Sequence, residues 1–300
     1  MMKILNLMED TAGENEVFAE HGFCVYIETP MHRILVDTGA SEKTWDNARK
    51  LGIDISGVDL VFLSHGHYDH SGGLLSFARQ NLNAKIYMHV RAGMEYYSLP
   101  EEICMSCGDM RGGMPIGDRL GGGREKYIGI DKRILELPQT VLLERGCRID
   151  QEVSVFSGVT GRRKWPKSNL RLKRKTGEGY VQDSFDHEQY VAVEAEGKKI
   201  LISGCAHNGI LNILDRFREL YHGDPDIVVS GFHMVKKTEY DDEERLLIRD
   251  VAKELREMDT QFYTGHCTGT PAFQIMKEIM GDRLTFMHSG DLVLLGGVNY

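Results

Sequence analysis

The sequence lacks any long apolar run. No stretch approaches the roughly 18 to 20 continuous apolar residues that a membrane-spanning helix needs. Residues 1–18 reach acidic side chains within ten positions and contain no apolar signal core followed by a small-residue cleavage site. These absences argue against a membrane class and predict a cytoplasmic protein.

The sequence also lacks an excess of basic residues. The 45 acidic residues outnumber the 36 Lys and Arg residues, which gives a formal net charge of -9 at pH 7. This charge argues against general affinity for nucleic acids. With 41% hydrophobic and 27% charged residues over 300 positions, and without repeats or low-complexity tracts, the composition is typical of a globular protein with a substantial core.

The six cysteines do not form a disulfide framework, because they are scattered along a long chain. Cys104 and Cys107 make a lone CxxC motif. A structural zinc site would need two further ligands, and the sequence has no second pair. The two thiols could form a redox pair, but a pair of unrelated reduced thiols explains the signal more simply.

Short β-rich runs alternate with amphipathic helical patterns over residues 22–90 and again from residue 190 onward. This alternation predicts a layered α/β architecture with helices covering the sheets. Between about residues 95 and 180 the pattern is irregular, and no linker bounds the segment. We therefore expect one domain over residues 1–300 with an insertion or lid at about 95–180.

Within this insertion, residues 162–175 carry eight cations and no acid. The guanidinium groups of Arg162 and Arg163 would suit a substrate phosphate, since arginine is always charged and binds phosphate bidentately. A solvated loop is the simpler alternative. His89 ends an apolar run and is a further candidate for the wall of a site, although a structural role fits it equally well.

Histidines recur where apolar runs end in Ser or Thr. The four cases are His65, His207, His233 and His266. If these runs are parallel strands, their carboxyl ends meet at one edge, which is where α/β proteins place their sites. The recurrence predicts one composite site rather than four separate histidines.

Residues 65–70 hold the densest group of potential metal ligands. His65 and His67 can point to the same side and bind one ion. A tight turn can direct Asp69 and His70 toward a second ion about 3.5 to 4 Å away. A single histidine is usually an ordinary core or surface residue, but imidazole and carboxylate groups this crowded predict metal binding.

The segment SHGHYDHSGGL has the His-x-His-x-Asp-His pattern of the metallo-β-lactamase superfamily, and ILVDTG resembles that superfamily's Asp-x-Gly turn. Together with ISGCAHNGILNI, VVSGFHM and TGHCTGTPAF, these segments resemble the branch related to 7,8-dihydropterin-6-methyl-4-(β-D-ribofuranosyl)-aminobenzene-5′-phosphate synthase. The resemblance implies a four-layer αββα sandwich with a one- or two-metal site at one edge of the paired sheets.

The resemblance also assigns ligands to the two ions. It implies His65 and His67 on one ion, and Asp69, His70 and His266 on the other.

The middle ligands depart from the usual pattern of the superfamily. Cys205 stands where an aspartate is usual, as a thiolate ligand or as a buried cysteine. His207 is our candidate ligand from this turn, and Asp183 and His187 are weaker candidates. His233 is expected above the metals as a substrate-binding or acid–base residue, or as a histidine that orients another group.

Such a centre can activate water and polarise a carbonyl or phosphoryl oxygen. We therefore predict a metal-dependent hydrolase-type enzyme with two divalent ions, most simply zinc, with iron, manganese or nickel as alternatives. The expected substrate is a small anionic molecule, phosphorylated and pterin- or nucleotide-like. Asp69 and His233 are the expected catalytic residues, and the irregular middle segment could supply an interface between copies of the chain.

Three other functions stay open at this point. The first is the condensing synthase activity that the resemblance implies. The second is a nucleic-acid phosphodiesterase, against which the overall acidity and the lack of an RNA-binding module speak. The third is a non-catalytic metal or redox protein that uses Cys104 and Cys107.

Overall fold

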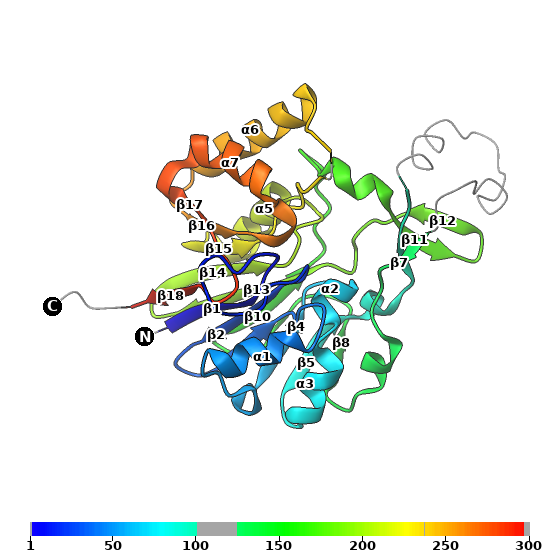
Figure 1. Ribbon diagram of the computed structural model, residues 1–300, viewed down its shortest axis with the longest axis vertical. Helices are drawn as coiled ribbons and strands as arrows, with labels where there is room; N and C mark the ends of the chain where they lie inside the picture. The colour runs from blue at the N-terminus through cyan, green and yellow to red at the C-terminus, as the bar shows by residue number, and fades with distance from the viewer. Residues whose placement is uncertain (1, 101–124, 237, 297–300) are drawn as a thin grey trace.

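The computed structural model describes residues 2–100, 125–236 and 238–296. Two large β-sheets lie face to face at the centre, helices cover both outer faces, and a small third sheet lies at one end (Figure 1). This is the four-layer α/β sandwich that the sequence predicts, so the predicted fold class is confirmed.

The first sheet begins with antiparallel strands and ends with parallel ones. β18, β1, β2 and β3 pair antiparallel, whereas β3, β4, β5 and β8 are parallel. In spatial order its strands are β18 (Leu292–Leu295), β1 (Met2–Met8), β2 (Cys24–Glu28), β3 (Arg33–Val36), β4 (Leu60–Leu63), β5 (Lys85–His89) and β8 (Thr140–Leu143).

The second sheet repeats this mixed pattern. β17, β16, β15 and β14 are parallel, and β14, β13, β10 and β9 are antiparallel. In spatial order its strands are β17 (Leu284–Phe286), β16 (Gln261–Thr264), β15 (Ile227–Ser230), β14 (Lys198–Ser203), β13 (Gln189–Ala195), β10 (Val153–Ser157) and β9 (Cys147–Arg148).

Apolar side chains from both sheets fill the space between them. Val25 and Phe62 of the first sheet belong to one buried cluster with Val191 and Ile202 of the second. Strands such as β2 and β4 read as nearly continuous apolar runs because both of their faces are buried. The two sheets therefore form a stiff platform whose edges hold the loops.

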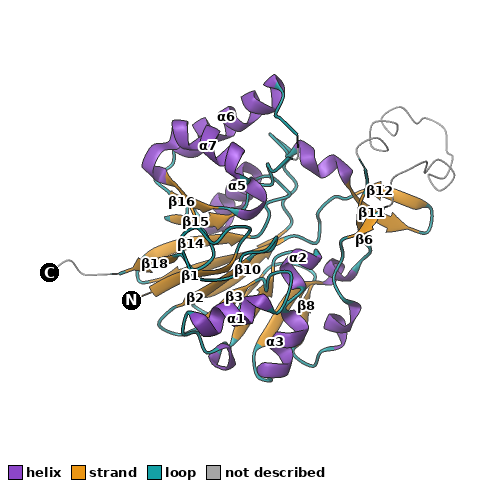
Figure 2. Ribbon diagram, in the orientation of Figure 1, coloured by secondary structure: helices purple, strands orange, loops and turns teal. Residues whose placement is uncertain are grey.

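Helices cover the outer faces, as the colouring by secondary structure shows (Figure 2). α1 (Lys43–Lys50) and α3 (Leu74–Gln80) pack on the first sheet through Trp45 and Phe77. The second sheet is covered by α5 (Ile210–Tyr221), α6 (Asp242–Arg256) and α7 (Thr270–Met280). The short α2 (Tyr68–Ser71) follows β4 directly. Among the described residues, none of the helices has the length and apolarity that a bilayer crossing demands.

The described parts of the middle segment, residues 95–100 and 125–180, contain more regular structure than their irregular sequence suggests. They supply β8 to the first sheet, and β9 and β10 to the second. They also build most of the third sheet, whose strands are β12 (Gly179–Gln182), β11 (Leu172–Thr176), β6 (Tyr96–Ser98) and β7 (Lys126–Tyr127). The one-turn helix η6 (Lys167–Arg171) precedes β11. Part of this segment is thus integral to the sandwich.

One imidazole joins the two main sheets. His32, in the turn between β2 and β3, places Nδ1 2.5 Å from Asp59 Oδ2 and Nε2 2.5 Å from Asp150 Oδ2. Asp59 precedes β4 of the first sheet, and Asp150 precedes β10 of the second. Burial opposes a charge on His32, but the two carboxylates outweigh it and raise the pKa of His32 above its ordinary value of 6.5.

Replacing His32 with asparagine should remove a pH-dependent part of the stability. Because the folded-state pKa is raised, the contribution is complete below about pH 6.5 and is lost as the pH rises through the folded-state pKa. In denaturant titrations, His32→Asn should therefore lose more unfolding free energy at about pH 6 than at about pH 9. His222→Asn, which changes an exposed imidazole after α5, is the matched control. Equal losses at both pH values would contradict a charged bridge.

Candidate metal centre

The candidate residues gather where parallel strands end. β3, β4 and β5 run in one direction, and so do β14, β15 and β16. The chain leaves β4 into His65, β14 into Cys205, β15 toward His233 and β16 toward His266. Rings from the two sheets meet there: the centroids of His65 and His207 are 4.8 Å apart. The structure thus brings the strand-end histidines to one edge of the sandwich.

His65, His67 and His207 form a first group of converging atoms. His65 Nε2 lies 3.0 Å from His67 Nδ1 and 3.2 Å from His207 Nε2. Nitrogens that share a tetrahedral zinc at 2.0–2.1 Å stand about 3.3 Å apart. All three residues are buried, and burial lowers the pKa of each, that of His67 to about 3. They are therefore neutral imidazoles, the form that binds metal.

Asp69, His70 and His266 form a second group. Asp69 Oδ2 lies 3.8 Å from His70 Nε2 and 3.5 Å from His266 Nε2. Burial opposes ionisation of Asp69, but His70 and further imidazoles outweigh it and hold the pKa of Asp69 well below its usual range. The group therefore offers a carboxylate oxygen and two ring nitrogens.

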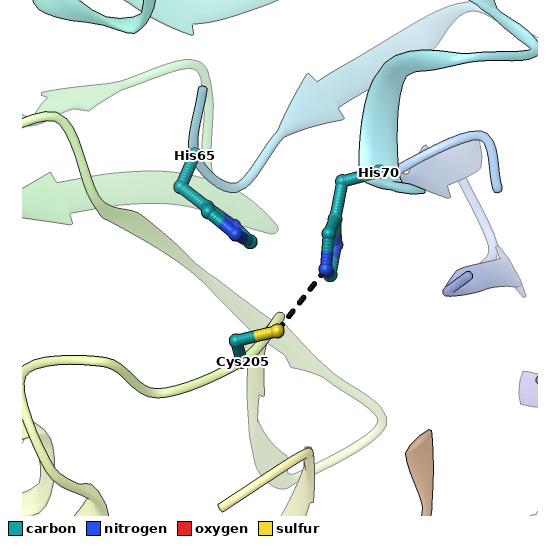
Figure 3. A group of neighbouring side chains, drawn as sticks. All are labelled: His65, His70 and Cys205. Atoms are coloured by element: carbon teal, nitrogen blue, oxygen red, sulfur yellow. Dashed lines mark hydrogen bonds between the residues drawn. The ribbon is translucent and has the colours of Figure 1, made fainter. Parts of the chain in front are cut away.

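Cys205 lies between the two groups. Its Sγ is 3.1 Å from His70 Nε2, and the rings of His65 and His70 converge on this sulfur (Figure 3). Burial raises the pKa of the Cys205 thiol well above its ordinary value. A thiolate is therefore unfavourable here unless a cation lies beside the sulfur.

In four of these histidines the outer ring nitrogen, Nδ1, which points away from the centre, contacts an oxygen atom. The pairs, with their Nδ1-to-oxygen distances, are His65–Ser64 (2.9 Å), His70–Asp37 (2.6 Å), His207–Asn169 (2.9 Å) and His266–Asp10 (2.6 Å). Such a partner fixes the ring orientation and leaves Nε2 for the centre. Four imidazoles are thus aimed at the space between the two sheet edges.

The donor set fits divalent metal ions. Among the described residues, the buried Nε2 of His266 has no hydrogen-bond partner. Burial disfavours a charge on His266, but Asp10 and Asp69 outweigh it and raise the pKa of His266 well above its usual value. A divalent ion in the place of that proton would satisfy the same groups.

The backbone is left-handed at the ends of several of these strands. Asp37, Ala206, His233 and His266 have φ values of 62°, 51°, 51° and 46°. Non-glycine residues in this region carry strain of order 1–3 kcal/mol, and such strain concentrates at functional sites. Glu188 supports one of these turns, since its carboxylate accepts hydrogen bonds from the backbone N–H groups that follow Ala206.

Asp183 and His187 support the loop beside the centre. Both ring nitrogens of His187 contact other protein groups and do not point into the centre. His187 Nδ1 accepts a hydrogen bond from Gly66 N–H at 3.0 Å, and His187 Nε2 lies 3.2 Å from Asp183 Oδ2. Gly66 has no room for a side chain, because a Cβ there would lie 2.4 Å from Ala92 O. The pair therefore fixes the loop that carries His65 and His67.

His233 lies beside the first group. Its ring centroid is 4.1 Å from that of His207, and its carbonyl accepts a hydrogen bond from Ser168 Oγ at 2.7 Å. Within the described part of the chain, both ring nitrogens of His233 are buried without a hydrogen-bond partner. They are therefore available to a ligand.

His89 and Arg162 line a separate cavity of about 1230 Å³. None of the predicted metal ligands is among its described lining residues. Phe185 belongs to this lining and also stacks on His207, with 4.5 Å between the ring centroids. Arg162 donates to Asn208 Oδ1 at 2.9 Å, so its guanidinium is engaged by the protein.

Arg163 lies away from the centre. Its guanidinium pairs with Asp215 of α5 and Glu254 of α6. The neighbouring Lys164 also pairs with Glu254, at 2.7 Å. Acidic helix residues therefore balance three of the eight cations of the basic run, since Lys167 pairs with Glu243 of α6. Cys104 and Cys107 lie outside the described residues.

Asp10 and His21 also lie at this site, although no sequence pattern indicated either of them. His21 Nδ1 lies 2.9 Å from Asp10 Oδ2, and His21 Nε2 lies 3.3 Å from Asp69 Oδ2. These contacts raise the pKa of His21 to about 9. Asp10 follows β1, so the same strand-end rule could have found it had residues 2–8 been recognised as a strand.

Comparison with known proteins finds similarity to one superfamily. Residues 17–126 match the model of the metallo-beta-lactamase superfamily. An uncharacterised protein of Methanocaldococcus jannaschii is 25% identical over 295 residues, covering 97% of this chain and 99% of its own. The 7,8-dihydropterin-6-methyl-4-(beta-D-ribofuranosyl)-aminobenzene-5′-phosphate synthase of the same organism is 27% identical over 307 residues, covering 97% of this chain and 96% of its own.

Solved structures agree with this likeness. Tm1679, described as a metal-dependent hydrolase of the beta-lactamase superfamily, is 27% identical with a TM-score of 0.77, covering 99% of this chain and 100% of its own. The metallo-beta-lactamase fold protein YhfI from Bacillus subtilis shares the fold at 12% identity, with a TM-score of 0.52 and coverage of 97% and 98%. With the sandwich and its edge of converging imidazoles, these matches show that the chain has the metallo-beta-lactamase fold and is similar to proteins of that superfamily.

Proposed function

We propose that the protein is a metal-dependent enzyme that activates water at a two-ion centre and hydrolyses a small anionic substrate. One observation carries this proposal: four buried imidazoles have their outer nitrogens held by oxygen atoms and their inner nitrogens turned toward one space. A histidine with a structural role would need only one hydrogen bond to its ring. Burying four polar imidazoles together costs free energy, and bound cations best explain how that cost is offset.

The two groups of atoms assign the ligands. His65, His67 and His207 would hold the first ion, and Asp69, His70 and His266 the second. We propose Cys205 as a thiolate ligand, because its sulfur lies where both groups meet. We assign Asp183 and His187 to the support of the His65–His67 loop.

Bound divalent ions supply Lewis acidity toward a carbonyl or phosphoryl oxygen and toward water. The carboxylate of Asp69 faces the same space and can accept a hydrogen bond that orients the attacking water. His233 offers an unpaired imidazole beside His207 and can hold or transfer a proton at a substrate oxygen. Asp69 and His233 are therefore the proposed catalytic residues.

A small anionic substrate suits the surroundings of the centre. The exposed Lys126 places Nζ 4.6 Å from the Tyr68 ring centroid and donates to Tyr68 Oη at 3.0 Å. Tyr68 lies between His67 and Asp69 in the chain, so a cation stands beside the ligand loop. Arg162 and Arg163 are poorer candidates for this role, because protein groups already engage both guanidiniums.

Zinc is the metal we propose first, since it accepts imidazole, carboxylate and thiolate ligands together. Iron, manganese and nickel are the alternatives. We further propose that the chain is one domain in which the third sheet covers the substrate side of the centre. The contact between Tyr96 of this sheet and His187, at 4.1 Å between ring centroids, supports that role.

A condensing synthase reaction is the second candidate function. The Methanocaldococcus jannaschii synthase is similar over nearly the full length of both chains, which supports a shared reaction class. Tm1679, at the same identity, is described as a hydrolase. The two relatives name different reactions at similar identity, so an assay must separate them.

His65→Ala and His67→Ala should each lower bound metal by about one ion per chain, because each removes a ligand of the first group. Metal content is measured by plasma mass spectrometry after loading with zinc and exhaustive dialysis. His222→Asn is the matched control and should keep the wild-type content. Unchanged content in both ligand variants would contradict the assignment.

Cys205→Ser should abolish the near-ultraviolet thiolate-to-cobalt absorption of the Co²⁺-loaded protein, because a hydroxyl gives no such band. Cys147→Ser, which changes a partly exposed cysteine on β9, should leave the absorption intact. If the band persists in Cys205→Ser and disappears in Cys267→Ser, the neighbouring thiol is the ligand and our assignment of Cys205 fails.

The reaction itself is tested with zinc-loaded protein given small phosphomonoesters and phosphodiesters. Turnover should follow metal content and should fall by about 10²-fold or more in His233→Ala and Asp69→Asn, as expected for loss of an acid–base group. A parallel assay supplies 4-(β-D-ribofuranosyl)-aminobenzene 5′-phosphate with a 7,8-dihydropterin whose 6-methyl group carries a leaving group; formation of the condensed product there, with no hydrolysis of the esters, would replace the hydrolase proposal with the synthase reaction.

A further inference from the structure

His21 lies at the solvent side of the second group of ligands. It belongs to the segment between β1 and β2, and 53% of its side chain is exposed. Its ring centroid is 4.8 Å from that of His266. Its Nε2 is 3.3 Å from Asp69 Oδ2, which is closer than either His70 Nε2 or His266 Nε2 lies to that oxygen. His21 is thus nearer to the Asp69 carboxylate than two of the proposed ligands are.

Asp10 holds His21 in the way that oxygens hold the four buried ligand histidines. Asp10 Oδ2 lies 2.9 Å from His21 Nδ1, while Asp10 Oδ1 lies 2.6 Å from His266 Nδ1. One carboxylate therefore orients two imidazoles, and each directs its Nε2 toward Asp69. A carboxylate on the outer nitrogen is the usual support of a metal-ligating histidine.

The backbone next to His21 is anchored against the centre. Phe23 N–H donates to Asp69 O at 3.2 Å. A Cβ on Gly22 would lie 2.9 Å from Asp69 O and 2.8 Å from Ala40 N, so the chain passes too closely here for a side chain. His21 therefore has a fixed position despite its exposure.

We propose that His21 is a further protein ligand of the second ion, beside Asp69, His70 and His266, and that Asp10 positions both His21 and His266. This inference rests on the proposed function, because it requires a second ion. The 3.3 Å between His21 Nε2 and Asp69 Oδ2 is the spacing of two ligands that share one tetrahedral ion at about 2.0–2.1 Å. With 53% of its side chain exposed, His21 is the most exposed of the four proposed ligands of this ion.

A protonated His21 that only hydrogen-bonds to Asp69 is the competing arrangement, and cobalt distinguishes the two. In the protein loaded with two equivalents of Co²⁺, a ligated imidazole gives a strongly shifted, solvent-exchangeable N–H signal in the proton NMR spectrum. His21→Ala should lack one such signal and should bind the second Co²⁺ at least about tenfold more weakly in chelator competition. His222→Asn should keep every signal and the wild-type affinity.

Asp10→Asn tests the positioning role. Its second-ion affinity should fall about 10- to 100-fold, the usual effect of removing a carboxylate behind ligating histidines. Affinity for the first ion should stay at the wild-type value. An Asp10→Asn protein with wild-type affinity for both ions would overturn the role of Asp10.

Two results would overturn the assignment of His21 as a ligand. Only the second would also overturn the proposed two-ion function. If the wild-type protein binds two ions and His21→Ala keeps every shifted N–H signal, His21 is not a ligand and the proposed two-ion function still stands. If the wild-type protein binds only one ion, the two-ion function and the role of His21 fail together. Loss of one signal in His21→Gln as well as in His21→Ala, with unchanged thermal unfolding, supports the assignment.

Discussion

The centre depends on a single constraint: a buried imidazole must have both nitrogens satisfied. At four positions an oxygen takes the outer N–H, which leaves the inner lone pair turned toward the neighbouring imidazoles. Lone pairs so close together in a dry space are unfavourable unless a proton or a metal ion lies between them. The sandwich brings the strand ends together, but the oxygens behind the rings decide where the rings point.

Those oxygens act on a strained backbone. Ala206, His233 and His266 leave the parallel strands β14, β15 and β16 in the left-handed region. Such residues persist only where the surroundings over-determine them. Here the sheet fixes the chain before each turn, and carboxylates such as Glu188 bind the N–H groups after it. Stability of the whole sandwich is thus a condition for the geometry of its edge.

Sequence patterns predicted much of the fold and of the ligand loop. Apolar periodicity and the spacing of ligand residues can both be recognised within short stretches of the chain. Apolar periodicity predicts the layers, and the spacing of His65, His67, Asp69 and His70 indicates one ligand loop; their metal stays a prediction. The rest depends on distant contacts. Asp10 meets His266 across 256 positions, and Arg163 meets Glu254 across 91. No local sequence pattern shows that the Asp10 carboxylate supports His266. None shows that the Glu254 carboxylate neutralises Arg163, which was expected to bind substrate.

The contact between Asn169 and His207 has a consequence for the proposed function. Asn169 lies in η6, at the foot of the third sheet, and its side chain and that of His207 are both buried. If the third sheet covers the substrate side of the centre as proposed, the segment leading into it also holds a proposed ligand of the first ion. Remodelling that segment to accept a new molecule would then alter metal retention in the same step, so substrate range and metal affinity would be inherited as one trait.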